Sequence, residues 1–473
     1  MAIIGNPISS ITGGGNKKKG LNIIIVGCGK VGSALIKQLD KEGHEITVID
    51  QNASRVSEIT NQYDIMGVVG NGASYSVQME ANIQSADLII AVTASDELNL
   101  LCCTIAKRTS ECAAIARVRT PDYSREADYL KEKLGLAMII NPELLAANEM
   151  ARILYLPTAL EVNAFADNHV ELVKFKIPDN NILANKTIRD LSPSVINNDI
   201  LICVVERDGE VFIPYGDFVL RAKDTISFAS TKKNTLEFLH KVGFNTNQVE
   251  DTIIIGGGTE AYYLASLLLS KGIQVKIIEI DRDRCEELTS LLPKAIIING
   301  DGTDEGLLRE EGIENSESVV PLTGIDEENI ILTLYANQVS HAKVITKIDR
   351  TNFRQVIKTL DLDSVIFPQY LTCEKIIAYV RAKQNSMGCD IETLYHLFDD
   401  KVEAIEFKID QESVITNTPI MDLKLKKDLL ICFIHRNGKV ITPSGSDEIK
   451  VGDAVMIVTT NTGFNDILDI LDK

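Results

Sequence analysis

The chain contains no tryptophan, and aromatic residues make up only 5% of its 473 residues. This scarcity argues against the stacking platforms that hold single-stranded nucleic acids or sugars. Acidic residues outnumber basic ones, 67 against 48, which gives a net charge of −19. Because such a surface repels phosphates, the composition excludes the usual binder of duplex DNA or RNA. We therefore expect no nucleic-acid partner.

Long apolar runs are also missing. The richest segments, such as Leu88–Val92 and Ala295–Ile298, end after a few residues, whereas a membrane-spanning helix needs about 20. The nine cysteines have no CxxC spacing, as expected of a reduced cytosolic protein. The six histidines form no repeated pair and no HExxH spacing. We expect neither a metal site nor a catalytic histidine.

The first 20 residues are rich in glycine, serine and lysine and show no hydrophobic periodicity. Their lysines follow the mildly apolar start, which is the reverse of the order in a secretory signal. We expect residues 1–20 to be a disordered leader outside the fold.

The remainder is a tandem repeat. The segment IIIVGCGKVG at Ile23–Gly32 returns as IIIGGGTEA at Ile253–Ala261, so that Gly27 corresponds to Gly256, an offset of 229 positions. The segment ERDGEVFIPYGD at Glu206–Asp217 resembles HRNGKVITPSGS at His435–Ser446 at the same offset. A register kept over two hundred residues indicates two copies of a unit of roughly 225 residues.

Each copy has two parts. In the first, apolar runs alternate with helical segments, which predicts a doubly wound, Rossmann-like parallel sheet; in the first copy these runs are Ile23–Val26, Ile46–Ile49, Ile65–Val69, Leu88–Val92 and Ala114–Val118. The second part has shorter strands and a hairpin at Asp208-Gly209, which predicts a small α+β lobe. The expected fold is thus α/β, with nucleotide-binding lobes at 21–145 and 250–375 and α+β lobes at 160–245 and 395–473. Helices near Asn141–Arg152 and Tyr370–Arg381 are expected to connect the lobes.

The segment Gly27–Gly32 has the pattern G-x-G-x-x-G and lies between an apolar strand and a helix. In a dinucleotide site Gly27 permits the tight turn, Gly29 lets the diphosphate approach the backbone, and Gly32 lets the helix pack on the strand. The loop, which includes Cys28, Lys30 and Val31, then offers unpaired N–H groups to the phosphates. Asp50, at the end of the next strand, accepts hydrogen bonds from a ribose and repels a 2′-phosphate, so the pattern favours NAD(H) over NADP(H). A nucleotide-binding fold without a ligand is the alternative.

The second copy has the variant pattern G-x-G-x-x-A, with Gly256, Gly257, Gly258, Thr259, Glu260 and Ala261. Glu279 takes the place of Asp50. Glu260 brings a negative charge to the helix end that faces the phosphates, which weakens anion binding if the side chain points inward. This second site is expected to bind either NAD(H) or another adenine nucleotide such as ATP or ADP, or to remain without a ligand.

Further candidates follow the strands at the carboxyl edge of each sheet, where open α/β sheets bind ligands. Residues after the third strands are placed to meet an adenine, and these are Gly70, Asn71 and Asp301. Thr93 and Thr323 follow the fourth strands. Arg117 ends the fifth strand, where it would offset phosphate charge, and Lys347 is its counterpart. For each of these residues a surface turn or an ordinary salt bridge is the alternative.

The order of these motifs resembles one known family. The sequence carries GCGKVG, Asp50, VGNGAS, AVTASDELN, ARVRTPDY and NPE, then the small lobe, and then both parts again. It resembles the peripheral NAD-binding subunits of Trk potassium uptake systems, the TrkA family, which carry tandem RCK domains. The resemblance covers about 450 residues from Leu21 onward. Gly27, Gly29, Gly32 and Asp50 match the family's motif, whereas Asn71 replaces its usual aspartate.

The resemblance implies a cytosolic homo-oligomer, a dimer or a tetramer, at the inner face of the cell membrane. It also implies an integral potassium-translocating partner of the TrkH or TrkG type, gated by the bound nucleotide. A nucleotide-sensing regulator of another cation transporter is the nearest alternative. An NAD-dependent oxidoreductase would need an acid/base group and a substrate pocket, usually from a larger second domain. Because the second lobes are small and duplicated, we expect cofactor binding without catalysis.

Overall fold

The structure of the chain, a computed structural model, describes residues 20–191, 199–350, 356–357, 359–360, 362–384 and 389–472. The expected leader, residues 1–20, lies outside the described residues except for Gly20. Among the described helices, none is long and apolar enough to cross a bilayer.

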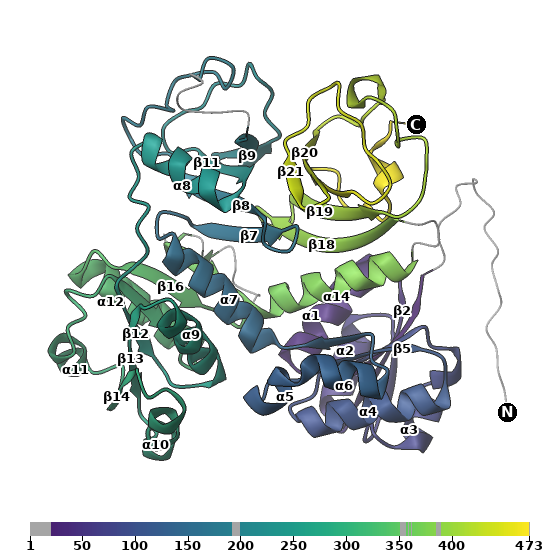
Figure 1. Cartoon of the computed structure of the whole chain (residues 1–473). Helices are drawn as coiled ribbons and strands as arrows, with labels where there is room; N and C mark the ends of the chain where they lie inside the picture. The colour runs from purple at the N-terminus through teal and green to yellow at the C-terminus, as the bar shows by residue number, and fades with distance from the viewer. Residues whose placement is uncertain are drawn as a thin grey trace.

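Two parallel sheets of six strands each form the N-lobes, and they have the same strand order (Figure 1). The first sheet has the order β3-β2-β1-β4-β5-β6, with β1 Asn22–Val26, β2 Glu45–Asp50, β3 Met66–Val69, β4 Leu88–Ala91, β5 Ala113–Arg117 and β6 Met138–Ile140. The second has the order β14-β13-β12-β15-β16-β17, with β12 Asp251–Ile255, β13 Gln274–Glu279, β14 Ile296–Asn299, β15 Ser318–Pro321, β16 Lys343–Lys347 and β17 Ser364–Ile366. The predicted doubly wound fold is confirmed.

Helices cover both faces of each sheet, which explains why the central strands are apolar throughout. In β1, Ile23 and Ile25 pack into one core and Ile24 and Val26 into the other. The helices of the first N-lobe are α1 Lys30–Lys41, α2 Ala53–Gln62, α3 Tyr75–Glu80, α4 Asp96–Thr109, α5 Pro121–Arg125 and α6 Ala127–Leu134. Those of the second are α9 Thr259–Ser270, α10 Arg282–Leu291, α11 Glu305–Glu310 and α12 Asp326–Val339.

The C-lobes are antiparallel sheets of five strands each. The first has the order β10-β9-β11-β8-β7, with β7 Glu161–Phe165, β8 Val170–Lys176, β9 Leu201–Arg207, β10 Glu210–Phe212 and β11 Thr225–Ser230, followed by α8 Lys232–Lys241. The second has the order β18-β19-β22-β20-β21, with β18 Cys389–Leu397, β19 Val402–Ile409, β20 Leu429–Arg436, β21 Lys439–Ile441 and β22 Ala454–Thr459. The expected Asp208-Gly209 turn joins β9 to β10 with positive φ at both residues, as a two-residue hairpin requires.

Each N-lobe is joined to its C-lobe by a helix that packs on the opposite N-lobe (Figure 1). The first of these helices is α7, Pro142–Tyr155, whose Met150 and Leu154 share a core with Leu264 of α9. The second is α14, Pro368–Gln384, which contributes Ile376 to a core with Leu35 of α1. The two halves therefore exchange their connecting helices within one chain, which the sequence repeat does not reveal.

The C-lobes lie side by side above the N-lobes in Figure 1 and share a core. Cys203 and Cys432 occupy the same position in the two repeats, and their Sγ atoms lie 3.4 Å apart in this core. Both thiols are buried. The approximate twofold axis that relates the two halves therefore passes between these two cysteines.

A buried ionic network joins the first N-lobe, α14 and the second C-lobe. Arg381 of α14 donates to Glu42 at 2.7 Å and to Glu403 at 3.0 Å. His396 lies between Glu403 and Glu374, with Nε2 3.4 Å from the former and Nδ1 3.6 Å from the latter. Burial lowers the pKa of His396, but the two carboxylates outweigh burial and raise this pKa to about 9. His396 is therefore charged at neutral pH.

This network predicts a loss of stability in mild alkali. A histidine whose pKa is raised on folding contributes stability that is complete below its unfolded value, about 6.5, and is lost as the pH rises through about 9. We expect wild type to lose on the order of 3 kcal/mol of stability between pH 6.5 and 9.5. Chemical denaturation of wild type and His396→Gln across this range tests it, because the variant should lack this slope. Parallel pH profiles would contradict the assignment.

Candidate functional site

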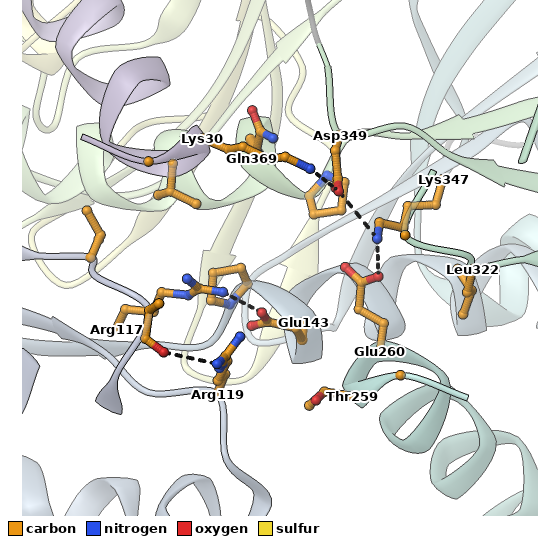
Figure 2. Close-up of a pocket in the computed structure, with 18 of the residues that line it drawn as sticks. Lys30, Arg117, Arg119, Glu143, Thr259, Glu260, Leu322, Lys347, Asp349 and Gln369 are labelled. Atoms are coloured by element: carbon orange, nitrogen blue, oxygen red, sulfur yellow. Dashed lines mark hydrogen bonds and ion pairs between the residues drawn. The ribbon is translucent and has the colours of Figure 1, made fainter. Parts of the chain in front are cut away.

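A single cavity of about 1160 Å³ lies between the carboxyl edges of the two N-lobe sheets. Both glycine-rich loops line it, together with the first residues of α7 and α14. Figure 2 shows side chains from the two halves facing one another across this space. The two nucleotide edges predicted from the repeat thus form one shared cleft.

The first glycine loop has the geometry of a diphosphate cradle. Gly27 has a φ of +106°, which favours glycine, and its N–H donates to the Ile49 carbonyl at 2.8 Å. A Cβ on Gly32 would lie 1.9 Å from the Gly27 carbonyl oxygen, so the helix start packs directly on the turn. A Cβ on Gly29 would meet nothing within 4 Å. Gly29, which precedes α1 and lines the cavity, leaves its space open to a ligand.

Asp50 connects this loop to β2. One carboxylate oxygen accepts a hydrogen bond from the Cys28 N–H at 2.7 Å, and the other accepts from the Asn52 N–H at 2.8 Å. These bonds fix the carboxylate at the cavity wall. Each oxygen keeps a further lone pair with which it can accept a ribose hydroxyl.

Most of the residues predicted from the sequence line the cavity. In the first half these are Gly27, Gly29, Lys30, Val31, Asp50, Gly70, Thr93 and Arg117, and in the second half Gly256, Gly257, Gly258, Thr259, Glu279, Asp301 and Thr323.

Three predicted residues are not among those that line the cavity. Cys28 is buried, and burial together with the Asp50 charge raises the pKa of its thiol to about 12. Gly32 lies beneath the turn, where its role is packing. Asn71 uses its side-chain oxygen to accept the Ala73 N–H at 3.0 Å, which closes a turn.

The second loop repeats this geometry, with one change of charge. Gly256 has a φ of +103°, and Glu279 accepts hydrogen bonds from the Gly257 and Asp281 N–H groups at 2.5 and 2.7 Å. Glu260, in the first turn of α9, is buried and lies 3.0 Å from Lys347. Its carboxylate therefore reduces the positive potential of this helix end, whereas the first turn of α1 has no acidic residue.

Two buried asparagines that sequence reasoning missed hold the fourth and fifth strands together at the cavity. Asn99 accepts the Thr93 hydroxyl at 2.7 Å and donates to the Arg117 carbonyl at 3.0 Å. Asn329 makes the same contacts with Thr323 and Lys347 in the second half. Their repetition in VTASDELN and LTGIDEEN was the available signal. Both threonine hydroxyls thus help to fix their turns.

Charged residues cross the middle of the cavity, and the ion pair of Lys30 forms only when the two halves face each other. Arg117 lies 2.5 Å from Glu143 of α7. Lys30 lies 2.8 Å from Asp349, which in turn lies 3.5 Å from Lys347 (Figure 2). Glu143 and Asp349 were not predicted. Each follows a strand at the carboxyl edge of its own sheet, but the contact between Asp349 and Lys30 depends on the facing lobes.

Comparison with known families gives two matches, each occurring twice along the chain. The TrkA-N domain matches residues 23–142 and 252–368, and the TrkA-C domain matches residues 172–243 and 404–472. The Methanosarcina mazei protein "Trk system potassium uptake protein TrkA homolog 1" is 30% identical over 456 residues, which cover 94% of this chain and 99% of that protein. The Haemophilus influenzae protein "Trk system potassium uptake protein TrkA" is 29% identical over 440 residues, which cover 92% and 95%.

Solved structures with a similar fold include two of GsuK. The "GsuK channel bound to NAD" has a TM-score of 0.62 at 18% identity, covering 94% of this chain and 77% of that one. The GsuK RCK domain has a TM-score of 0.63 at 18% identity, covering 94% and 93%. At this level of identity the likeness establishes the fold.

The loop geometry predicts that alanine is tolerated at Gly29 and destabilising at Gly32. Gly32→Ala should cost about 3 kcal/mol of stability, because its Cβ overlaps a backbone oxygen. Gly29→Ala has open space and an ordinary φ of −75°, so it should cost about 1 kcal/mol or less. Urea denaturation of both variants measures the difference. Equal losses would show that the tight helix–turn contact is not as described.

Proposed function

The chain belongs to the TrkA family, and on that premise we propose that it is the regulatory subunit of a potassium uptake system that binds NAD(H). Its matches to TrkA-N and TrkA-C domains run in the tandem order expected from the sequence. The names of its relatives support a role in potassium uptake. In this role the protein lies in the cytoplasm, at the inner face of the membrane, against an integral potassium-translocating subunit of the TrkH or TrkG type.

The first glycine loop is the observation that carries the nucleotide assignment. Gly29 leaves an open approach to the start of α1, where unpaired backbone N–H groups and Lys30 favour an anion. Asp50 is fixed on the same wall to receive the adenosine ribose. Its negative charge opposes a 2′-phosphate, so NAD(H) is the preferred dinucleotide over NADP(H).

The second loop is the weaker of the two proposed nucleotide sites. Glu279 and Asp301 line the cavity in the second half, where they could receive an adenine nucleotide, and ATP or ADP is the second candidate ligand. Burial raises the pKa of the Glu260 carboxyl even though Lys347 opposes this rise. When ionised, Glu260 lies where a diphosphate would need positive potential. We therefore assign the tighter dinucleotide site to the first loop.

Gating follows from the position of the cavity between the N-lobes. A ligand that contacts both lobes biases their arrangement only if its affinity differs between the two arrangements. Each tenfold difference supplies about 1.4 kcal/mol per site. Each of the helices α7 and α14 connects an N-lobe to its own C-lobe and packs on the opposite N-lobe. A change at the cavity therefore reaches the C-lobes and, through the assembly, the translocating subunit.

Ligand-dependent stability tests the nucleotide assignment. NADH at 100 times its Kd should raise the free energy of unfolding by about 2.7 kcal/mol, and NADPH should raise it much less. Asp50→Ala should narrow the difference between the two cofactors, while the matched change Glu279→Ala should leave most of it. Thermal denaturation with each cofactor measures these shifts. Equal stabilisation of wild type by both cofactors would contradict the role of Asp50.

Purification of the chain from native membranes tests the transport assignment. We expect an integral potassium transporter subunit to co-purify, because the proposed role requires a stable complex with the translocating protein. Mass spectrometry identifies the partner, and a membrane preparation lacking the chain serves as the control. Recovery of a different cation transporter would redirect the proposal to the alternative regulator.

A further inference from the structure

An ion pair spans the cavity between the two N-lobes at the start of α1. Lys30 is the first residue of this helix, and its Nζ lies 2.8 Å from Oδ2 of Asp349, which follows β16 in the second half. Figure 2 shows the two side chains meeting across the cavity. The lysine at the first dinucleotide site is thus held by a carboxylate of the opposite half.

The two partners differ in how far their side chains are buried. The Asp349 side chain is only 17% exposed, and its backbone N–H donates to the buried Asp326 at 2.9 Å. It also lies near Lys347, at 3.5 Å. The Lys30 side chain is 59% exposed, and its four-carbon stem can reorient. A competing anion can therefore draw Lys30 away while Asp349 stays in place.

The repeat does not reproduce this pair on the other side of the cavity. The counterpart of Lys30 is Thr259, and the counterpart of Asp349 is Arg119. Arg119 donates to the Ala94 carbonyl at 2.9 Å. Because Thr259 has no charge, the equivalent contact cannot be an ion pair. The connection through Lys30 is specific to the first dinucleotide site.

We propose that Asp349 determines the affinity of the first dinucleotide site by holding Lys30 in an ion pair that the diphosphate must displace. The inference rests on the proposed function, because it requires an anion at the start of α1. The diphosphate and Asp349 compete for one ammonium group, so binding of the dinucleotide removes a connection between the N-lobes. Loss of this ion pair therefore couples ligand binding at the first loop to the second half.

The freed carboxylate also affects the second loop. Lys347 lies between Glu260, at 3.0 Å, and Asp349, at 3.5 Å. Once Lys30 leaves, Asp349 attracts Lys347 more strongly and weakens its hold on Glu260. The charge of Glu260 at the start of α9 is then less compensated, and an anion there is disfavoured.

Calorimetric titration of NADH into the full chain at low salt tests the proposal, with wild type, Asp349→Asn, Lys30→Met and the double variant. Asp349→Asn removes the competitor and should tighten binding by about threefold to fivefold, the upper part of the range expected of a partly exposed ion pair. Lys30→Met should weaken binding. Asp349→Asn should then have no further effect in the Lys30→Met background, because the ammonium group for which it competes is gone.

Glu328 supplies a matched control, since it belongs to α12 of the second half and lines the same cavity. Glu328→Gln removes one negative charge and should change the affinity by less than about 1.5-fold. The proposal is overturned if this control tightens binding as much as Asp349→Asn, or if Asp349→Asn acts equally with and without Lys30. If wild type and all variants fail to bind NADH, the proposed function itself fails and the inference falls with it.

Discussion

The packing of each connecting helix on the opposite half is the constraint on which the rest of the structure depends. Met150 and Leu154 of α7 are buried against the second N-lobe, and Ile376 and Val380 of α14 against the first. Burial of each such side chain contributes about 1.5–3 kcal/mol relative to exposure. Separating the halves would expose all of them, so the two repeats are stable together as one interlocked unit. This is a stronger requirement than the simple tandem arrangement that the repeat suggests.

The same exchange decides where the nucleotide edges point. Each connecting helix begins at the carboxyl edge of its own sheet, just after β6 or β17, and continues across the other lobe. Pro142 and Pro368, the first residues of these helices, both line the cavity. The carboxyl edges must therefore face each other, and the two loops share one space. A ligand bound there would act on the relation between the lobes, unlike a ligand bound to an isolated lobe.

Local pattern was sufficient to predict the lobes and the glycine loop, because each depends on residues close in sequence. Apolar runs that alternate with helical segments predicted the parallel sheets, and the glycine pattern of Gly27–Gly32 predicted the turn at Gly27. The pairing of the halves could not be predicted, because it depends on the apolar faces of α7 and α14. The sequence of these faces would look the same if each helix packed on its own lobe. The ion pair between Lys30 and Asp349 was missed for that reason. Asn71 was expected near the adenine, and that expectation stays a prediction; its side-chain oxygen closes a local turn, as Asn often does in loops.

The repeats agree at contacts that fix the backbone and differ in charges that face each other across the cavity. Cys203 and Cys432 meet at equivalent positions in the shared C-lobe core, and Asn99 and Asn329 make the same contacts at the strand ends. At the cavity, by contrast, Lys30 corresponds to Thr259 and Asp349 to Arg119. Equivalent residues can pack against each other because symmetry preserves their shape. Two facing anion sites in one cavity would instead place their positive charges close together. Loss of positive charge at one loop removes that repulsion, and it leaves the second half free to supply a competing carboxylate to the first.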